Sequence, residues 1–256
     1  MSLVMGAFFL TALLYSSVGF GGGSTYNAIL IFSGVDYRIV PVLSLCCNVI
    51  VVAGGIWHFH RHNHLSFSRV MPWIIFSVPA AFIGGAIHIS ETFFVGLLGS
   101  VLLFSGLRLL WPETVLAADV AVSRQGSRYQ KILPATLGSA LGFVAGLTGI
   151  GGGIFLAPVF YFIKWGNPKQ IAAACALFIF VNSCAGIVGQ FFKLDNAGLL
   201  LLIQPYWMFF PAVLLGGQVG AALSANRLNL VFIKRATAVL ILYVALRLLT
   251  KFFYLI

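Results

Sequence analysis

The stretch that decides the fold is SSVGFGGGSTYNAIL, from Ser16 to Leu30, which returns as GLTGIGGGIFLAPVF from Gly146 to Phe160. Each stretch places a run of glycines inside an apolar segment. Glycine loses more conformational freedom on folding than any other residue, and it allows backbone geometries that other residues avoid. A run of glycines therefore predicts a break in a helix. The recurrence of the break raises the question of whether the whole chain is duplicated.

The two halves of the chain resemble each other well beyond the glycine runs. At an offset of about 130 residues, Gly19 falls on Gly149, and Asn48 then falls near Asn182. Weak internal symmetry of this kind is typical of transporters that are built from internal repeats. We expect a first membrane repeat at 1–111, a cytoplasmic linker at 112–131 and a second membrane repeat at 132–256.

The composition predicts an integral membrane protein. Of the 256 residues, 61% are hydrophobic and 8% are charged, and the mean hydropathy is +1.04. A soluble domain carries about 25% charged residues, which it needs for its surface. The net charge of +10 comes from basic residues scattered between apolar segments. Because they form no basic face, we expect no nucleic-acid partner.

Each half contains five apolar segments, of which the second is too short to span a bilayer. A membrane-spanning helix needs about 20 apolar residues. We expect an all-α polytopic protein with two inverted repeats, each holding a glycine-broken hairpin, re-entrant or tilted, and three transmembrane helices. The expected segments are 2–18, 24–34, 38–58, 69–89 and 92–111, then 132–148, 154–164, 171–191, 199–223 and 228–250.

The basic residues favour this hairpin arrangement over four crossings per repeat, which would make the repeats parallel. Cytoplasmic loops carry an excess of lysine and arginine. The parallel arrangement divides the basic residues 9 to 6, whereas the hairpin divides them 11 to 4. In the hairpin arrangement the smaller set comprises Arg38, Lys193, Arg247 and Lys251, and the termini lie outside the cytoplasm.

The glycine breaks predict an anion site made of backbone. A helix start leaves N–H groups without partners and carries about half a positive charge. Two such starts that face each other near the bilayer midplane would bind an anion without a buried arginine. The alternative is that the glycines serve close helix packing. The residues expected to bind substrate are Gly21, Gly22, Gly23, Ser24, Thr25, Asn27, Asn48, Gly151, Gly152, Gly153, Ile154 and Asn182.

The charged and metal-binding residues point away from a cation substrate. All five acidic residues fall in loops or at segment ends, whereas cation transporters usually carry a carboxylate within the membrane. His58, His60, His62 and His64 could instead serve a metal-ion permease, although no cysteine or carboxylate joins them. A non-transporting membrane scaffold is the other alternative. We expect no catalytic residues, no bound metal and no cofactor.

The doubled motif, GFGGGSTYNAIL and GIGGGIFLAPVF, resembles the repeated glycine-rich motif of the TauE/SafE sulfite exporter family, also called 4-toluene sulfonate uptake permeases. The second copy keeps the proline that follows the glycines in that family, at Pro158, whereas the first copy has Asn27 or Ala28 there. The resemblance implies a secondary carrier of sulfite, thiosulfate, sulfoacetate or another organosulfonate in the bacterial inner membrane. The coupling ion, the direction of transport and a homodimeric assembly are left open.

Overall fold

The computed structural model describes residues 2–17, 19–110, 129–193, 202–225 and 230–255, and the regular structure of these residues is entirely helical. The first half holds α1 (Ser2–Ser16), α2 (Gly23–Phe32), α3 (Val40–Arg61), α4 (Phe67–Ala86) and α5 (Glu91–Leu110). The second half holds α6 (Tyr129–Thr148), α7 (Gly153–Phe162), α8 (Pro168–Lys193), the short 3-10 helix η1 (Gln204–Tyr206), α10 (Phe209–Ala225) and α11 (Leu230–Leu255).

The expected all-helical membrane architecture is confirmed. By length and composition, three helices of the described residues can cross a bilayer, namely α3, α4 and α8. The two helices that follow the glycine runs, α2 and α7, have 10 residues each and are too short to span. The outer surface is apolar, as lipid contact requires, and its exposed side chains include Leu10, Trp57, Phe104 and Phe192.

The segment expected at 199–223 is wrong in its boundaries. Within the described residues it is divided into η1 and α10, and α10 begins only at Phe209. Proline explains the division, because Pro205 stands at the start of η1 and has no N–H to continue a longer helix. The linker expected at 112–131 lies outside the described residues except for its last three, which begin α6.

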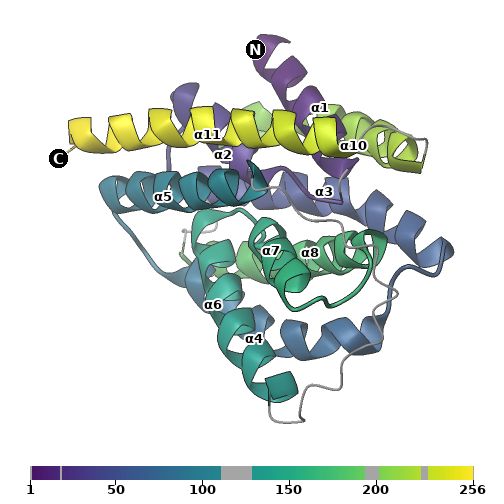
Figure 1. Ribbon diagram of the computed structural model, residues 1–256. Helices are drawn as coiled ribbons and strands as arrows, with labels where there is room; N and C mark the ends of the chain where they lie inside the picture. The colour runs from purple at the N-terminus through teal and green to yellow at the C-terminus, as the bar shows by residue number, and fades with distance from the viewer. Residues whose placement is uncertain (1, 18, 111–128, 194–201, 226–229, 256) are drawn as a thin grey trace.

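The helices of the two halves interleave. Figure 1 shows α5 beside α11 in the upper part of the molecule and α4 with α6 at the lower end, and these pairs are in contact. In addition, α10 packs on α1, and α3 packs on α8. Helix α2 packs on α3, and α7 packs on α8. The two short helices are therefore held against the central pair, α3 and α8.

Close packing between the halves depends on a second set of glycines, spaced by four residues. In α6, Gly142 and Gly146 lie against the backbone carbonyl groups of Ser77 and Ala81 in α4. In α10, Gly216 and Gly220 lie in the same way against α1. Small residues at this spacing let helix backbones approach closely in membranes. Close packing is therefore the role of these glycines, which are separate from the two runs.

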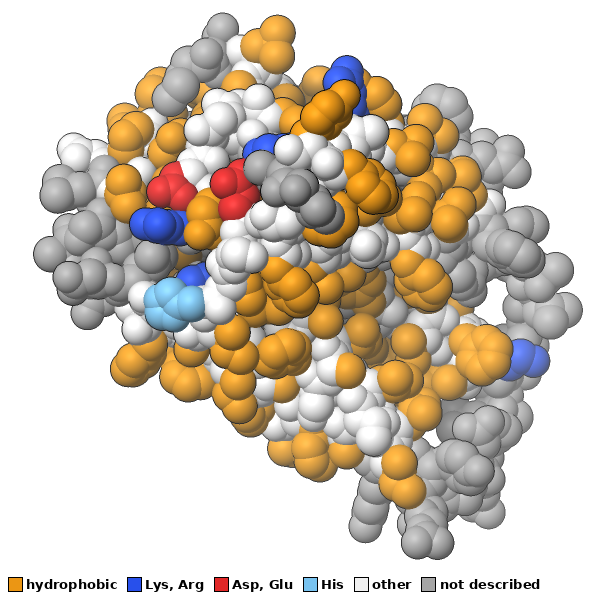
Figure 2. Space-filling model, turned by 90° about the vertical axis from the view of Figure 1, so that its left-hand side faces the viewer, with side chains coloured by type: hydrophobic (Ala, Val, Ile, Leu, Met, Phe, Trp, Pro, Cys, Tyr) orange, Lys and Arg blue, Asp and Glu red, His pale blue; other side chains and the backbone are white. Residues whose placement is uncertain are grey.

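On the face drawn in Figure 2 the acidic side chains gather in one place, whereas basic side chains also lie at the top and at the right-hand edge. Hydrophobic side chains cover most of its middle, while acidic side chains, with basic ones and a histidine beside them, gather toward the left-hand edge. Both acidic residues described by the structure, Asp36 and Glu91, lie at helix ends or in loops. The prediction that the acidic residues avoid the membrane interior holds for these two.

Candidate functional site at the two glycine breaks

In both glycine runs, the second-to-last glycine is left-handed and immediately precedes a helix. Gly22 has φ 91° and ψ 4° immediately before α2, and Gly152 has φ 78° and ψ −16° immediately before α7. A residue with a side chain adopts this conformation only at a cost. Neither helix start receives a side-chain cap. The N-cap residue of each helix is a glycine, so no N-cap side chain accepts a hydrogen bond from the first N–H groups.

Both helix starts are buried in the protein. Gly23, Ser24 and Thr25 of α2 are buried, as are Gly153 and Ile154 of α7. A buried helix start keeps its partial positive charge in surroundings of low polarity, where electrostatic interactions are strong. The two breaks therefore meet the first requirement of a backbone anion site.

The two breaks touch each other at Asn48. The Asn48 Nδ2 donates a hydrogen bond to the carbonyl oxygen of Ile150, over 3.1 Å. A Cβ on Gly23 would lie 2.5 Å from that Nδ2 and 2.9 Å from the carbonyl oxygen of Gly149. A Cβ on Gly21 would also collide with the Asn48 amide. The glycines of the first run thus make room for one amide that reaches the second run.

Asn182 does not play the matching part. Its Nδ2 donates to the carbonyl oxygen of Phe178, within its own helix. Gly19 lies against Ala172 in α8, and Gly149 lies against Pro41 in α3, so α3 and α8 correspond at an offset of 131 residues, from Pro41 to Ala172. The expectation that Asn48 and Asn182 occupy matching positions is therefore wrong.

The counterpart of Asn48 at the 131-residue offset is Ile179, which meets the second run through its side chain. Asn182 falls three residues beyond that position, just under one helical turn away. The glycine runs correspond at an offset of 130 residues and the helices at 131, whereas Asn48 and Asn182 are 134 residues apart. At these corresponding positions, α3 presents the polar side chain of Asn48 to the glycine breaks, whereas α8 presents the apolar side chain of Ile179.

The first turns of the two short helices also differ. Tyr15 Oη lies 2.8 Å from Thr25 Oγ1 and 3.4 Å from Ser24 Oγ, which forms a buried hydroxyl cluster in the first half. Asn27 Nδ2 donates to the carbonyl oxygen of Thr148, over 2.6 Å. The first turn of α7 is apolar by contrast, and its Ile154 is buried. The helix starts are therefore alike in backbone but not in side chains.

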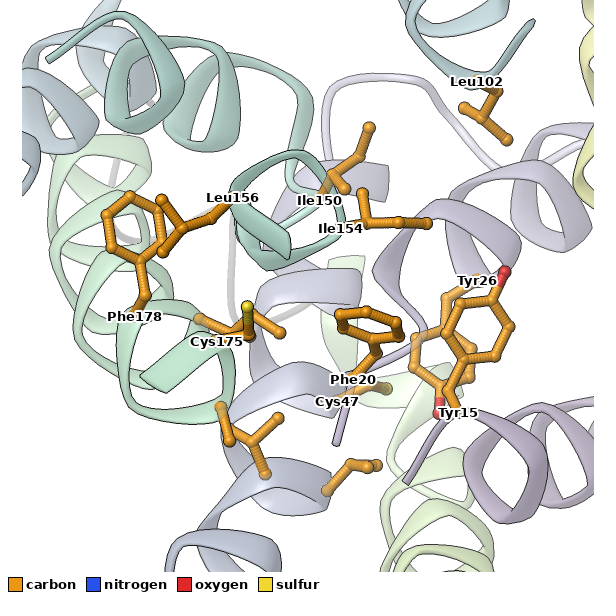
Figure 3. Close-up of a cluster of buried hydrophobic side chains, with 14 of the residues drawn as sticks. Tyr15, Phe20, Tyr26, Cys47, Leu102, Ile150, Ile154, Leu156, Cys175 and Phe178 are labelled. Atoms are coloured by element: carbon orange, nitrogen blue, oxygen red, sulfur yellow. The ribbon is translucent and has the colours of Figure 1, made fainter. Parts of the chain in front are cut away.

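Figure 3 shows the apolar side chains around these breaks. Phe20 and Ile154 lie near the centre of the view, Tyr15 and Tyr26 lie together on one side, and Phe178 lies on the other. All five are buried. Of the residues that shape the site, the sequence reasoning missed Tyr15 and Ile150. Tyr15 lies in an apolar helix, and Ile150 bonds Asn48 through its backbone carbonyl group, so neither carries a sequence signal for its polar contact.

The histidine stretch lies away from the glycine breaks, at the end of α3. The His58 and His62 rings lie 4.4 Å apart between centroids, and His62 Nδ1 lies 2.8 Å from the carbonyl oxygen of His58. Among the described residues, no group of three His, Cys, Asp or Glu side chains is placed to hold a metal ion. Burial, then the nearby Lys169 and His62, lower the pKa of His64. The lowered pKa favours the neutral imidazole of His64, so the stretch is a polar surface near Lys169.

Contacts at the helix ends join loops that are far apart in sequence. The guanidinium of Arg69 lies 4.2 Å from the centroid of the Trp165 ring and donates to the carbonyl oxygen of the same residue. Lys251 Nζ lies 3.1 Å from Glu91 Oε1. The imidazole of His88 lies 3.0 Å from the carbonyl oxygen of Lys193. These contacts fix which loops share an end of the molecule.

Comparison with known proteins agrees with the motif. Residues 4–248 match the family model described as Sulfite exporter TauE/SafE. The chain is 32% identical over 243 residues to the probable membrane transporter protein y4hK of Sinorhizobium fredii, covering 95% of this chain and 96% of that protein. No solved structure matches the chain.

Proposed function

Since the chain belongs to the TauE/SafE sulfite exporter family, whose members are membrane transporters rather than enzymes, we propose that it is a secondary carrier of sulfur-containing anions. The substrates are sulfite, thiosulfate or an organosulfonate such as sulfoacetate. The membrane is the inner membrane of a bacterium. The observation that carries this proposal is the contact of the two glycine breaks through Asn48, beside two buried helix starts that have no side-chain cap.

The chemistry of the breaks suits an oxyanion. Sulfur oxyanions present several oxygens, each of which accepts hydrogen bonds from backbone N–H groups and hydroxyls. The start of α2 offers Ser24 and Thr25 hydroxyls beside its N–H groups, and both residues are buried. Helix starts bind anions through their N–H groups and their dipole. The substrate-binding residues are those named from the sequence, with Asn182 the least supported because its amide is turned into its own helix.

The contacts at the helix ends support the inverted arrangement of repeats 1–111 and 132–256. The inverted arrangement places Arg69 and Lys164 on one side of the membrane, whereas the parallel arrangement separates them. Arg69 contacts Trp165, the residue after Lys164. Lys251 contacts Glu91, and His88 contacts Lys193, which again agrees with the inverted sidedness. Alternating access then follows from rocking of one repeat against the other around the breaks.

The metal-permease alternative has little structural support, because the described histidines form no site for a metal ion. The scaffold alternative predicts that glycine substitutions affect folding alone. Uptake of radiolabelled sulfite, thiosulfate and sulfoacetate into proteoliposomes, compared with chloride and nickel, tests all three functions. We expect saturable uptake of at least one sulfur anion. Nickel uptake without anion uptake would support the permease, and uptake of neither would support the scaffold.

A further inference from the structure

The buried side-chain atoms that have no hydrogen-bond partner share one property. Among the described residues they are all oxygens: Tyr26 Oη, Asn27 Oδ1, Ser44 Oγ, Asn48 Oδ1, Asn182 Oδ1, Ser183 Oγ and Gln190 Oε1. A buried acceptor without a partner costs about 1–3 kcal/mol. The three hydroxyl oxygens can both donate and accept hydrogen bonds, whereas the four amide oxygens can only accept them. A bound cation is one ligand that all seven oxygens could bind through their lone pairs.

The orientation of the amides follows from their partners. Asn27, Asn48, Asn182 and Gln190 each donate an N–H to a backbone carbonyl group. Turning any of these amides over would set its oxygen against a carbonyl oxygen, and the two acceptors would repel. The nitrogen therefore faces the backbone, and the amide oxygen is the atom that remains free.

Two of these oxygens, from Asn48 and Ser183, lie at the glycine breaks, and a third belongs to Ser44 on the same helix as Asn48. Ser183 Oγ lies 3.0 Å from the position of a Cβ on Gly151 in the second run, and Asn48 Oδ1 lies against Gly21 in the first run. Ser44 stands one turn before Asn48 on the same face of α3. All three side chains are completely buried.

A backbone carbonyl lies at the same place. Asn48 Oδ1 and the carbonyl oxygen of Gly149 lie 3.0 Å and 2.9 Å from the position of a Cβ on Gly23, which again limits their separation to the 5.9 Å sum. Unwound backbone carbonyls together with side-chain oxygens bind coupling cations in transporters with broken helices. The oxygens come from both halves of the chain, and they adjoin the start of α2.

We propose that Asn48 Oδ1, Ser44 Oγ, Ser183 Oγ and the carbonyl oxygen of Gly149 bind a sodium ion beside the transported anion. This inference rests on the proposed function, because the anion supplies the charge that the neutral oxygens lack. A cation and an anion held side by side away from water attract each other strongly. Each therefore raises the affinity for the other, by the same factor.

The chemistry of the ligands selects sodium over a proton. The buried polar side chains of the described residues are hydroxyls and amides. These groups bind a metal cation through their lone pairs, but they do not take up protons near neutral pH. The anion flux therefore follows a sodium gradient, and an imposed proton gradient does not replace it.

The experiment measures sulfur-anion uptake by proteoliposomes in sodium and in choline, together with the binding of radiolabelled sodium to the purified wild-type protein. We expect uptake to rise saturably with sodium, and the anion to increase sodium affinity by about tenfold. Ser183→Ala and Ser44→Ala each raise the sodium concentration for half-maximal uptake severalfold. Ser105→Ala is the control, because this serine lies in α5 and bonds its own helix at Val101.

Each outcome separates this inference from the proposed function. Equal anion uptake in sodium and choline overturns the sodium site and leaves the anion carrier in place. A sodium dependence that is unchanged in both serine variants overturns the assignment of the ligands. Absence of saturable sulfur-anion uptake in any medium overturns the proposed function itself. The binding measurement needs no variant, so it holds even if a substitution prevents folding, and failure of the anion to change sodium affinity overturns the coupling.

Discussion

The side chain of Asn48 in α3 donates a hydrogen bond to the carbonyl oxygen of Ile150, which belongs to the glycine break of the other half of the chain. This single bond joins residues 102 positions apart at the place where the two glycine breaks meet. Removing the amide should therefore affect stability and transport together. Asn48→Ala should lower the free energy of unfolding by roughly 1–2 kcal/mol, the range for polar contacts between membrane helices.

Thermal unfolding in detergent measures the loss of stability in Asn48→Ala, and proteoliposome uptake measures its effect on transport. We expect transport to fall by more than the loss of folded protein explains. Ser105→Ala serves as the control, because it also removes a polar side chain but lies far from the breaks in sequence. Full transport by folded Asn48→Ala would mean that the contact between the breaks is structural alone.

The fit of Asn48 against Gly21 predicts an energetic coupling between the two positions. A Cβ on Gly21 would collide with the Asn48 amide, and the φ of Gly21 is not positive, so the effect of Gly21→Ala is steric. In the Asn48→Ala background the space is free, and Gly21→Ala should cost less. A double-mutant cycle on thermal unfolding should give a coupling of about 0.5–3 kcal/mol. Additive effects of the two substitutions would mean that a side chain at position 21 does not touch Asn48.

The contact of α6 with α4 predicts that Gly142→Ala destabilises the protein. A Cβ there would collide with the carbonyl oxygen of Ser77, and overpacking of this kind costs about 1–3 kcal/mol. Gly6→Ala is the matched control, because a Cβ on Gly6 in α1 meets nothing within 4 Å. Alanine is also the better helix former, so the control should be neutral or stabilising. Equal unfolding temperatures for the two variants would contradict the close approach of α4 and α6.

The contact between Arg69 and Trp165 predicts which loops are reached from the same side of the membrane. A membrane-impermeant thiol reagent should label Ser68→Cys and Lys169→Cys from one side, and Ser90→Cys from the other. All three positions are exposed. The native cysteines are replaced beforehand, since Cys46 and Cys184 are partly accessible. Labelling of Ser68→Cys and Lys169→Cys from opposite sides would contradict the inverted arrangement.

The histidine stretch should be dispensable for transport. Replacement of His58, His60, His62 and His64 by glutamine should leave anion uptake within about twofold of wild type, because these side chains form a surface at the end of α3. Binding of nickel or zinc to the variant and to the wild type should be equally weak. Loss of all uptake in the folded variant would contradict this prediction and would show that transport depends on the histidines.

The sequence predicted the helices well, since their apolar segments and glycine punctuation are local features. The short α2 and α7 follow directly from the glycine runs. The division of the segment expected at 199–223 into η1 and α10 was not predicted. Pro205 marks the break, but the residues around it are apolar enough to resemble one continuous segment. The sequence shows the four-residue spacing of Gly142 and Gly146 in α6. It does not show that they pack on α4, because that contact depends on how the two halves interleave.

The candidate site was predicted in its backbone and only partly in its side chains. As expected from the sequence, a short helix begins at the last glycine of each run, at Gly23 and at Gly153. Asn48 and Asn182 looked equivalent because each is an amide in the middle of a helix, yet Asn182 lies three residues beyond the position in α8 that corresponds to Asn48. Contacts such as Tyr15 with Thr25 arise from the approach of α1 to α2, and no periodicity in either helix encodes them.

The most direct test of the paired helix starts is the affinity of the purified protein for the sulfur anion with the highest uptake, measured by calorimetry. Gly22→Ala and Gly152→Ala each place a side chain at a left-handed position, at a cost of about 1–3 kcal/mol, and disturb one helix start. In variants that remain folded, we predict at least a tenfold loss of affinity from either substitution, with Gly6→Ala unchanged. Wild-type affinity in both folded variants would contradict anion binding at the breaks.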